Sequence, residues 1–151
     1  MAVKSKEFRF PVHVEWLRDR TVVAQVPGKP ELEIGTPVEF WPDADVTVWS
    51  PEDAFATAAA SCLAVTILGK AAREKLPLLG LLVEGEGIVG RREDGSFGFV
   101  RLVERVELAT EPGEEERARA LVVSAERGCL VTVSLDVPVE LAIDVRVAAT
   151  R

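Results

Sequence analysis

The sequence predicts an α+β domain, in which an N-terminal antiparallel β-meander leads into one long buried helix, a β-hairpin, a second helix and a C-terminal strand. Three observations support this fold class. Segments rich in β-branched residues, bounded by glycine and proline, occupy both ends of the chain. A helix start followed by an apolar stretch lies near residue 50. The length of 151 residues suits a single domain spanning residues 1–151.

The predicted meander has three strand-like segments. Residues Phe8–Trp16 alternate apolar and polar side chains, as a strand with one buried face does. The turn "LRDR" follows, and then come "TVVAQV", the turn "PGKP" and "ELEIGTPVEF". The next segment, "WPDADVTVW", reads as a loop whose tryptophans Trp41 and Trp49 either line an apolar substrate pocket or pack in a core or dimer interface.

The long helix is predicted from its first residues. Ser50 can cap the N-terminus, Pro51 suits the first helical position, and Asp53 supplies a carboxylate in the first turn. The helix should run to about Lys75, because a Leu-Pro pair follows. Its middle, Ala54–Leu68, is apolar nearly all round, so we expect burial on most faces, against a sheet or a second subunit.

The second half of the chain continues with a hairpin. The segments "LLGLLVEGEGIVGRRED" and "GSFGFVRLVERVELATE" read as two strands joined by a turn at "EDGS". A second helix is expected from about Gly113 to Arg127, with Gly128 as a left-handed C-terminal cap. The Val-rich segment "LVTVSLDVPVELAIDVRVAA" is predicted to be the last strand.

Charge and composition exclude several classes of function. The net charge of −7 disfavours nucleic acid as a partner. We expect no apolar run to reach the roughly 18 residues of a membrane helix, and the first residues lack a signal-peptide core, so the sequence predicts a cytoplasmic protein without a membrane partner. Two cysteines and a single histidine, His13, which reads as a strand residue, argue against a zinc site.

The two cysteines are the candidate reactive groups. Cys62 lies among small residues within the long helix, roughly 16 Å beyond its first residue at 1.5 Å per residue, where the helix dipole has faded. A thiolate there needs an arginine from elsewhere or a break in the helix. Cys129 follows a helix C-terminus, which disfavours a thiolate but suits a sulfur that resolves an oxidised partner. The alternative is that both cysteines only pack in the core.

These motifs resemble a known family. The segment "SPEDAFATAAASC" resembles the "NPE...C" helix of the OsmC/Ohr family, and "SAERGCL" resembles its second-cysteine segment. A cysteine ten residues after Glu52, a second cysteine about 67 residues later and the order of the elements all match. Ser50 replaces the family's asparagine, and "WPDADVTVW" replaces a Gly-rich loop, which is typical of a general OsmC-like paralogue.

The resemblance implies an intertwined homodimer of OsmC-like fold with its active sites at the subunit interface. It further implies a cysteine-based peroxidase of oxidative-stress defence, which reduces organic hydroperoxides at Cys62, resolves the sulfenic acid with Cys129 and uses an external dithiol as reductant. No metal, flavin or other cofactor is implied. Glu52 matches a glutamate that holds a catalytic arginine, for which Arg18 is the first choice and Arg20 the second.

Two other functions remain open from the sequence. The altered loop before the long helix is also compatible with a non-catalytic OsmC-like protein that binds a small hydrophobic ligand in the dimer cleft. The third possibility is an interaction or scaffold role in which neither cysteine reacts. Only the peroxidase hypothesis predicts that peroxide produces a disulfide between Cys62 and Cys129.

Overall fold

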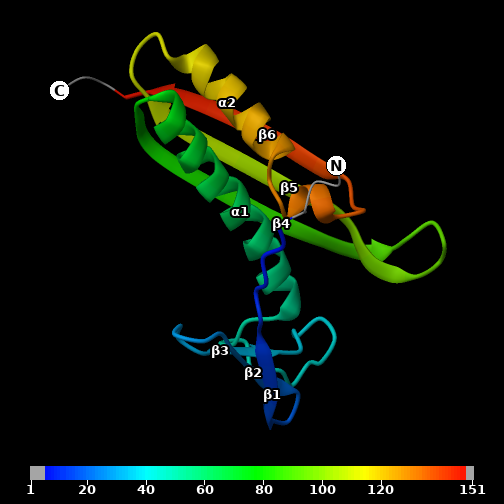
Figure 1. Cartoon of the computed structure of the whole chain (residues 1–151). Coiled ribbons are helices and arrows are strands. Elements are labelled where there is room, and N and C mark those ends of the chain that lie inside the picture. The colour runs from blue at the N-terminus through cyan, green and yellow to red at the C-terminus, as the bar shows by residue number, and fades with distance from the viewer. Residues whose placement is uncertain (1–5, 149–151) are drawn as a thin grey trace, which may run out of the picture. The chain divides into compact units, whose positions relative to one another are not determined.

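The computed structural model describes residues 6–148 and divides into two compact units (Figure 1). The N-terminal unit ends at Pro51, and the C-terminal unit begins at Glu52. The prediction of one domain over residues 1–151 remains a prediction. The elements are β1 (His13–Arg18), β2 (Thr21–Gln25), β3 (Leu32–Gly35), α1 (Pro51–Glu74), β4 (Leu78–Arg91), β5 (Phe97–Thr110), α2 (Glu115–Arg127), the 3-10 helix η1 (Thr132–Ser134) and β6 (Val139–Val147).

The N-terminal unit contains the predicted meander, an antiparallel sheet of order β1-β2-β3. The first strand begins at His13 rather than at Phe8, and the third has four residues. The prediction that the first strand buries one face is wrong for this chain, because all six residues of β1 are exposed. The physical reason is that the described part of this unit contains no helix that could cover the sheet.

The C-terminal unit is built on a second sheet, of order β4-β5-β6. The predicted hairpin is confirmed: β4 and β5 pair antiparallel over 14 residues each, and Gly95 adopts a φ of +83° in the turn between them. β6 pairs parallel to β5, with α2 in the connection. The last strand is shorter than predicted, because it begins at Val139 and the segment before it contains η1.

The two helices have nearly the predicted bounds. α1 runs unbroken from Pro51 to Glu74, and Lys75 ends it with a φ of 53°. α2 covers Glu115–Arg127. The prediction of a left-handed cap at Gly128 is wrong, since its φ is −106°. Its N–H instead donates to the carbonyl of Ala125 (3.0 Å) in a continuation of the right-handed turn.

The core lies between the two helices and one face of the β4-β5-β6 sheet, as Figure 1 shows. α1 contributes buried residues four positions apart, which form one stripe of the helix. The buried residues of the two helices are Ala59, Leu63, Ile67 and Ala71 of α1, and Ala118, Leu121, Val122 and Ala125 of α2. Val106 and Leu108 of β5 belong to the same core cluster, and Leu102 of β5 is also buried. The opposite face of the sheet carries charged pairs such as Arg105 with Glu84, 3.8 Å apart.

α1 and the hairpin approach closely where β4 is rich in glycine. A Cβ atom at Gly85 would lie 2.9 Å from the Cβ of Ala60, so only glycine allows this separation. One helical turn earlier, the ring of Phe55 stacks on that of Phe99, with centroids 4.0 Å apart. These contacts hold the first half of α1 against the sheet and so fix the position of the residues that follow it.

The predicted burial of α1 on most faces is not reached within a single chain, and burial against a second subunit stays a prediction. Only one stripe is buried, whereas Val65 and Leu68 are 64% and 50% exposed. By length and composition α1 could also cross a membrane, with a mean hydropathy of 1.5 over its best window and 28% of that window buried. The expectation that no apolar stretch reaches membrane length therefore does not hold, although the core helix of a soluble protein meets the same criterion.

Candidate active site

The fold brings Cys62 and Cys129 together. α1 and α2 lie side by side in opposite directions, joined by a hydrogen bond from Lys70 Nζ to Ser124 Oγ (2.8 Å) and another from Arg117 to the carbonyl of Glu74 (3.0 Å). Cys62 lies two helical turns before Lys70, and Cys129 lies just beyond the end of α2. In consequence Cys62 packs against the core cluster that contains Cys129, and each thiol influences the pKa of the other, although they are about 67 positions apart in the chain.

The surroundings of Cys62 favour its thiolate. Burial opposes ionisation, but the N–H of Val131, the thiol of Cys129, the N–H of Leu130 and the hydroxyl of Thr66 all act on the sulfur in the other direction. Their combined effect holds the pKa of Cys62 below that of an ordinary thiol. Two main-chain N–H groups from the turn after α2 thus provide part of the stabilisation that the sequence had led us to expect from an arginine.

Cys129 has the opposite tendency. It is fully buried, and burial is the main reason why the pKa of its thiol is raised. The hydroxyl and N–H of Thr132 partly offset that effect, whereas the neighbouring Cys62 adds to it. The sequence predicts the same direction from the C-terminus of α2, but burial is the larger cause. The pair therefore consists of one sulfur whose surroundings favour the thiolate and one whose surroundings favour the neutral thiol.

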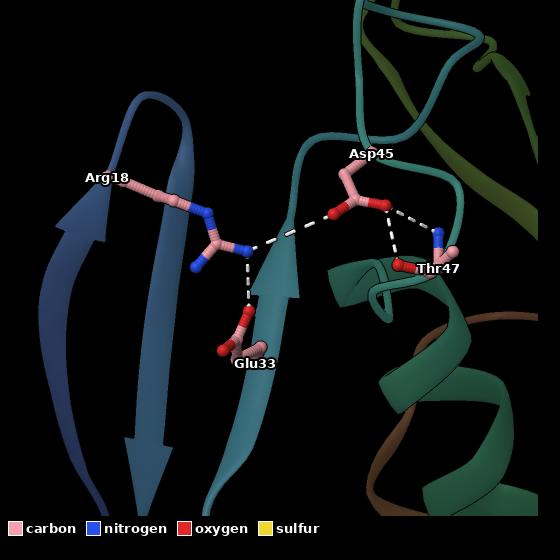
Figure 2. A network of polar contacts seen from close by, with 4 residues as sticks. All are labelled: Arg18, Glu33, Asp45 and Thr47. Atoms are coloured by element: carbon pink, nitrogen blue, oxygen red, sulfur yellow. Dashed lines mark hydrogen bonds and ion pairs between the residues drawn. The ribbon is translucent and has the colours of Figure 1, made fainter.

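Arg18 and Arg20 both lie in the N-terminal unit, at the turn between β1 and β2. Figure 2 shows the guanidinium of Arg18 beside Glu33, at 2.7 Å, and Asp45, at 3.9 Å. Asp45 is itself fixed by Thr47, whose N–H and hydroxyl donate to it at 2.9 and 2.6 Å. Arg18 is thus held by carboxylates of its own unit.

Arg20 has a different environment. Its guanidinium lies over the ring of Trp41, 5.0 Å from the centroid, in a cation–π contact. Trp41 was expected to line a pocket or to pack in an interface, and here it provides an aromatic face for an arginine. Because such a contact leaves the N–H groups at the edge of the guanidinium, Arg20 keeps its capacity to donate to an anion.

Glu52 is placed in the first turn of α1. One of its carboxylate oxygens, Oε2, is buried and has no hydrogen-bond partner among residues 6–148. A buried carboxylate oxygen without a donor is costly, so this position calls for a cationic partner. The structure assigns none of the described arginines to it.

A second buried carboxyl, Glu104, was not identified from the sequence as a site residue. It is fully buried in β5, and neither of its oxygens has a partner in the part of the chain that the structure describes. Burial, and next the charge of Glu126, raise its pKa. The available signal was its position between Leu102 and Val106, two buried residues that alternate along the strand.

Comparisons with known proteins agree with this fold. A family model described as OsmC-like protein matches residues 44–144, which is more than half of the chain. An OsmC-like protein of unknown function from Vibrio cholerae superposes with a TM-score of 0.84 at 18% identity, covering 91% of this chain and 99% of that one. An organic hydroperoxide resistance protein from Elizabethkingia anophelis, with thiocyanate bound, gives 0.77 at 18% identity, with 95% and 100% covered.

A third structural relative is the organic hydroperoxide resistance protein OhrB of Bacillus subtilis, with a TM-score of 0.64 at 19% identity, covering 92% of this chain and 98% of that one. The search of curated proteins gave no significant match. At these identities the solved structures support the fold, and the family model supports the assignment. This chain is a member of the OsmC-like protein family, with the α+β fold of the OsmC and organic hydroperoxide resistance proteins.

Proposed function

We propose that this protein is a thiol-dependent peroxidase that reduces organic hydroperoxides in oxidative-stress defence. The observation that carries the proposal is the contact between Cys62, whose pKa is lowered, and Cys129, whose pKa is raised. A peroxidatic sulfur needs to be a thiolate, and a resolving sulfur needs to lie within bonding reach of it. Several solved structures of the same fold carry names of organic hydroperoxide resistance proteins, which supports this substrate class.

The proposed reaction has three steps. The Cys62 thiolate attacks the distal oxygen of the hydroperoxide, the O–O bond breaks, and the alcohol leaves after taking up a proton. Cys129 then attacks the sulfur of the Cys62 sulfenic acid; its proton and the departing hydroxide form water, and a disulfide remains. An external dithiol reduces that disulfide through a mixed disulfide and is itself oxidised.

We further propose that an arginine completes the site. The support is the family resemblance around Glu52 together with the buried oxygen of that residue, which lacks a partner. Arg18 is the first candidate, although it is engaged with Glu33 and Asp45, and Arg20 is the second. A guanidinium near the thiolate would stabilise it further and orient the peroxide.

A homodimer is the assembly that we propose, as is typical of the family. Its support in this chain is the apolar surface that α1 exposes, since Val65 and Leu68 remain open to solvent in one chain. Single exposed apolar residues are ordinary, but here they continue the helix that carries Cys62. Sedimentation equilibrium measures the mass directly, and a monomer at micromolar concentration would contradict this part of the proposal.

The peroxidase activity is tested by following cumene hydroperoxide in the presence of dithiothreitol. Cys62→Ser is expected to abolish consumption, and Cys129→Ser to form a sulfenic acid in one turnover without closing a disulfide. Intact-mass spectrometry of the wild type after one equivalent of peroxide should show a loss of about two mass units, the two hydrogens removed when a disulfide forms. Equal rates for the wild type and Cys62→Ser would refute the proposal, and a copurifying apolar ligand would then favour a binding function.

A further inference from the structure

Each of the two cysteines is followed, one turn later, by a threonine that folds back onto it. The hydroxyl of Thr66 donates to the carbonyl of Cys62 (2.7 Å), and the hydroxyl of Thr132 donates to the carbonyl of Cys129 (3.3 Å). Thr132 and Cys129 are both buried, with exposed fractions of 6% and 0%. The carbonyl of each cysteine thus accepts a hydrogen bond from a threonine hydroxyl, and the two hydroxyls come from different elements, α1 and η1.

The two threonines differ in what their local structure explains. A threonine inside a helix commonly donates to the carbonyl four residues earlier, so the bond made by Thr66 is the ordinary one. Thr132 lies in a short turn rather than in a long helix; its hydroxyl donates to the carbonyl of Cys129, and both this hydroxyl and the N–H of Thr132 lower the pKa of the Cys129 thiol. Local helix geometry does not require these effects on the sulfur.

The turn from Cys129 to Thr132 divides its donors between the two sulfurs. The N–H groups of Leu130 and Val131 lower the pKa of Cys62, whereas the N–H and hydroxyl of Thr132 lower the pKa of Cys129. The turn itself is held by the N–H of Val133, which donates to the carbonyl of Cys129 (3.1 Å). A single short segment thus provides hydrogen-bond donors to the attacking and to the resolving sulfur.

We propose that Thr132 is a positioning residue for the resolving step: it holds the Cys129 sulfur beside Cys62 and stabilises the negative charge that this sulfur carries as it attacks. The inference rests on the proposed peroxidase function for its biological meaning. When Cys129 attacks, its S–H bond breaks and the new S–S bond forms, so charge develops on a buried sulfur. The hydroxyl of Thr132 can turn its proton from the carbonyl of Cys129 to the sulfur, and the N–H of Thr132 is a second donor, so both lower the barrier to this step.

The test uses 5,5′-dithiobis(2-nitrobenzoate), because this probe separates the two sulfurs and needs no peroxidase activity. The thiolate of Cys62 attacks the reagent and releases one thionitrobenzoate, leaving a mixed disulfide on Cys62. Cys129 then attacks that mixed disulfide and releases the second thionitrobenzoate as the internal disulfide forms. Both releases are followed by absorbance in a stopped-flow instrument, at several pH values.

Thr132→Val is expected to slow the second release about tenfold, which corresponds to about 1.4 kcal/mol, because a hydrogen bond to the developing thiolate is lost. The first release should stay within about twofold of the wild type, and the pH midpoint of the second should move upward. Thr132→Ser should restore the rate, because it keeps the hydroxyl. If Thr132 had a purely structural role, the pH midpoint of the second release would not move, and Thr132→Val and Thr132→Ser would release the second thionitrobenzoate at the same rate.

Thr110→Val is the matched control. Thr110 is also buried and donates to a main-chain carbonyl, that of Pro77 (2.8 Å), but none of its described contacts involves either cysteine. Its replacement should leave both releases unchanged after circular dichroism has verified folding. A second release in Thr132→Val as fast as in the wild type overturns the inference. Normal thionitrobenzoate kinetics without peroxide turnover would instead overturn the peroxidase proposal and leave the role of Thr132 in thiol exchange established.

Discussion

Replacing Glu104 by glutamine is predicted to remove a loss of stability that the wild type suffers as pH rises. Glu104 pairs with Gly85 across the hairpin, and the contact of Gly85 with Ala60 shows that this pair faces the helices. The paired residue on β6 is Leu141, and α2 presents Glu126. These neighbours provide no positive charge, so the folded protein favours the neutral carboxylic acid.

The sign and size of this pH-dependent change in stability follow from proton linkage. Burial first, and Glu126 second, raise the pKa of Glu104 above its ordinary value of 4.5. Between the pKa of Glu104 in the unfolded chain and its raised pKa in the folded chain, the folded chain binds up to one proton more than the unfolded chain. The contribution of Glu104 to stability is therefore full below the unfolded pKa and is lost as pH rises towards the folded pKa. Within that interval the slope is about 1.4 kcal/mol per pH unit for one group.

Urea unfolding of the reduced protein, followed by far-ultraviolet circular dichroism at pH 5, 6, 7 and 8, measures this effect. The difference in unfolding free energy between Glu104→Gln and the wild type should grow with pH in favour of the variant. Glu86→Gln is the control, because Glu86 lies on the same hairpin but is exposed. If the wild type and Glu104→Gln run parallel over this pH range, the reasoning from burial is refuted.

Three other outcomes are expected. Leu63→Ala empties part of the core beneath α1 and should cost about 2–5 kcal/mol in chemical unfolding, whereas Leu68→Ala at the half-exposed position should cost clearly less. Gly85→Ala places a methyl group 2.9 Å from Ala60 and should cost roughly 1–3 kcal/mol by the same measurement. Iodoacetamide should alkylate Cys62 with a pH midpoint below that of a free thiol, as mass spectrometry of the labelled peptides will show, while Cys129 in the folded protein should resist labelling.

The elements that the sequence predicted correctly are those with local signals. Pro51 and the acidic first turn mark the start of α1, and the turn containing Gly95 marks the hairpin, so each can be recognised without knowing the rest of the fold. The burial of these elements was predicted less well. One face of β1 and the outer faces of α1 carry apolar residues yet are exposed in one chain, because burial depends on what covers a face rather than on its own composition.

The segment after Cys129 is a part of the candidate site whose structure the sequence predicted wrongly. Its residues Val131, Thr132 and Val133 are β-branched and predict a strand. Instead the hydroxyls of Thr132 and Ser134 donate to the carbonyls of Cys129 and Leu130 (3.3 and 2.7 Å), and these local bonds favour a 3-10 turn. The main-chain donors that act on Cys62 exist only because of this turn, and an N–H group has no sequence signature.

The meeting of two distant sulfurs also links the redox state of the protein to its resistance to unfolding. A bond between Cys62 and Cys129 would close a loop of about 68 residues, and by the chain-entropy relation such a cross-link restricts the unfolded ensemble by about 4 kcal/mol. The oxidised chain would then melt at a higher temperature than the reduced one. Under the proposed peroxidase function, each cycle would therefore alternate between an oxidised form that is more stable towards unfolding and a reduced form that is less stable. A shortage of reductant would leave the protein in the more stable, oxidised form.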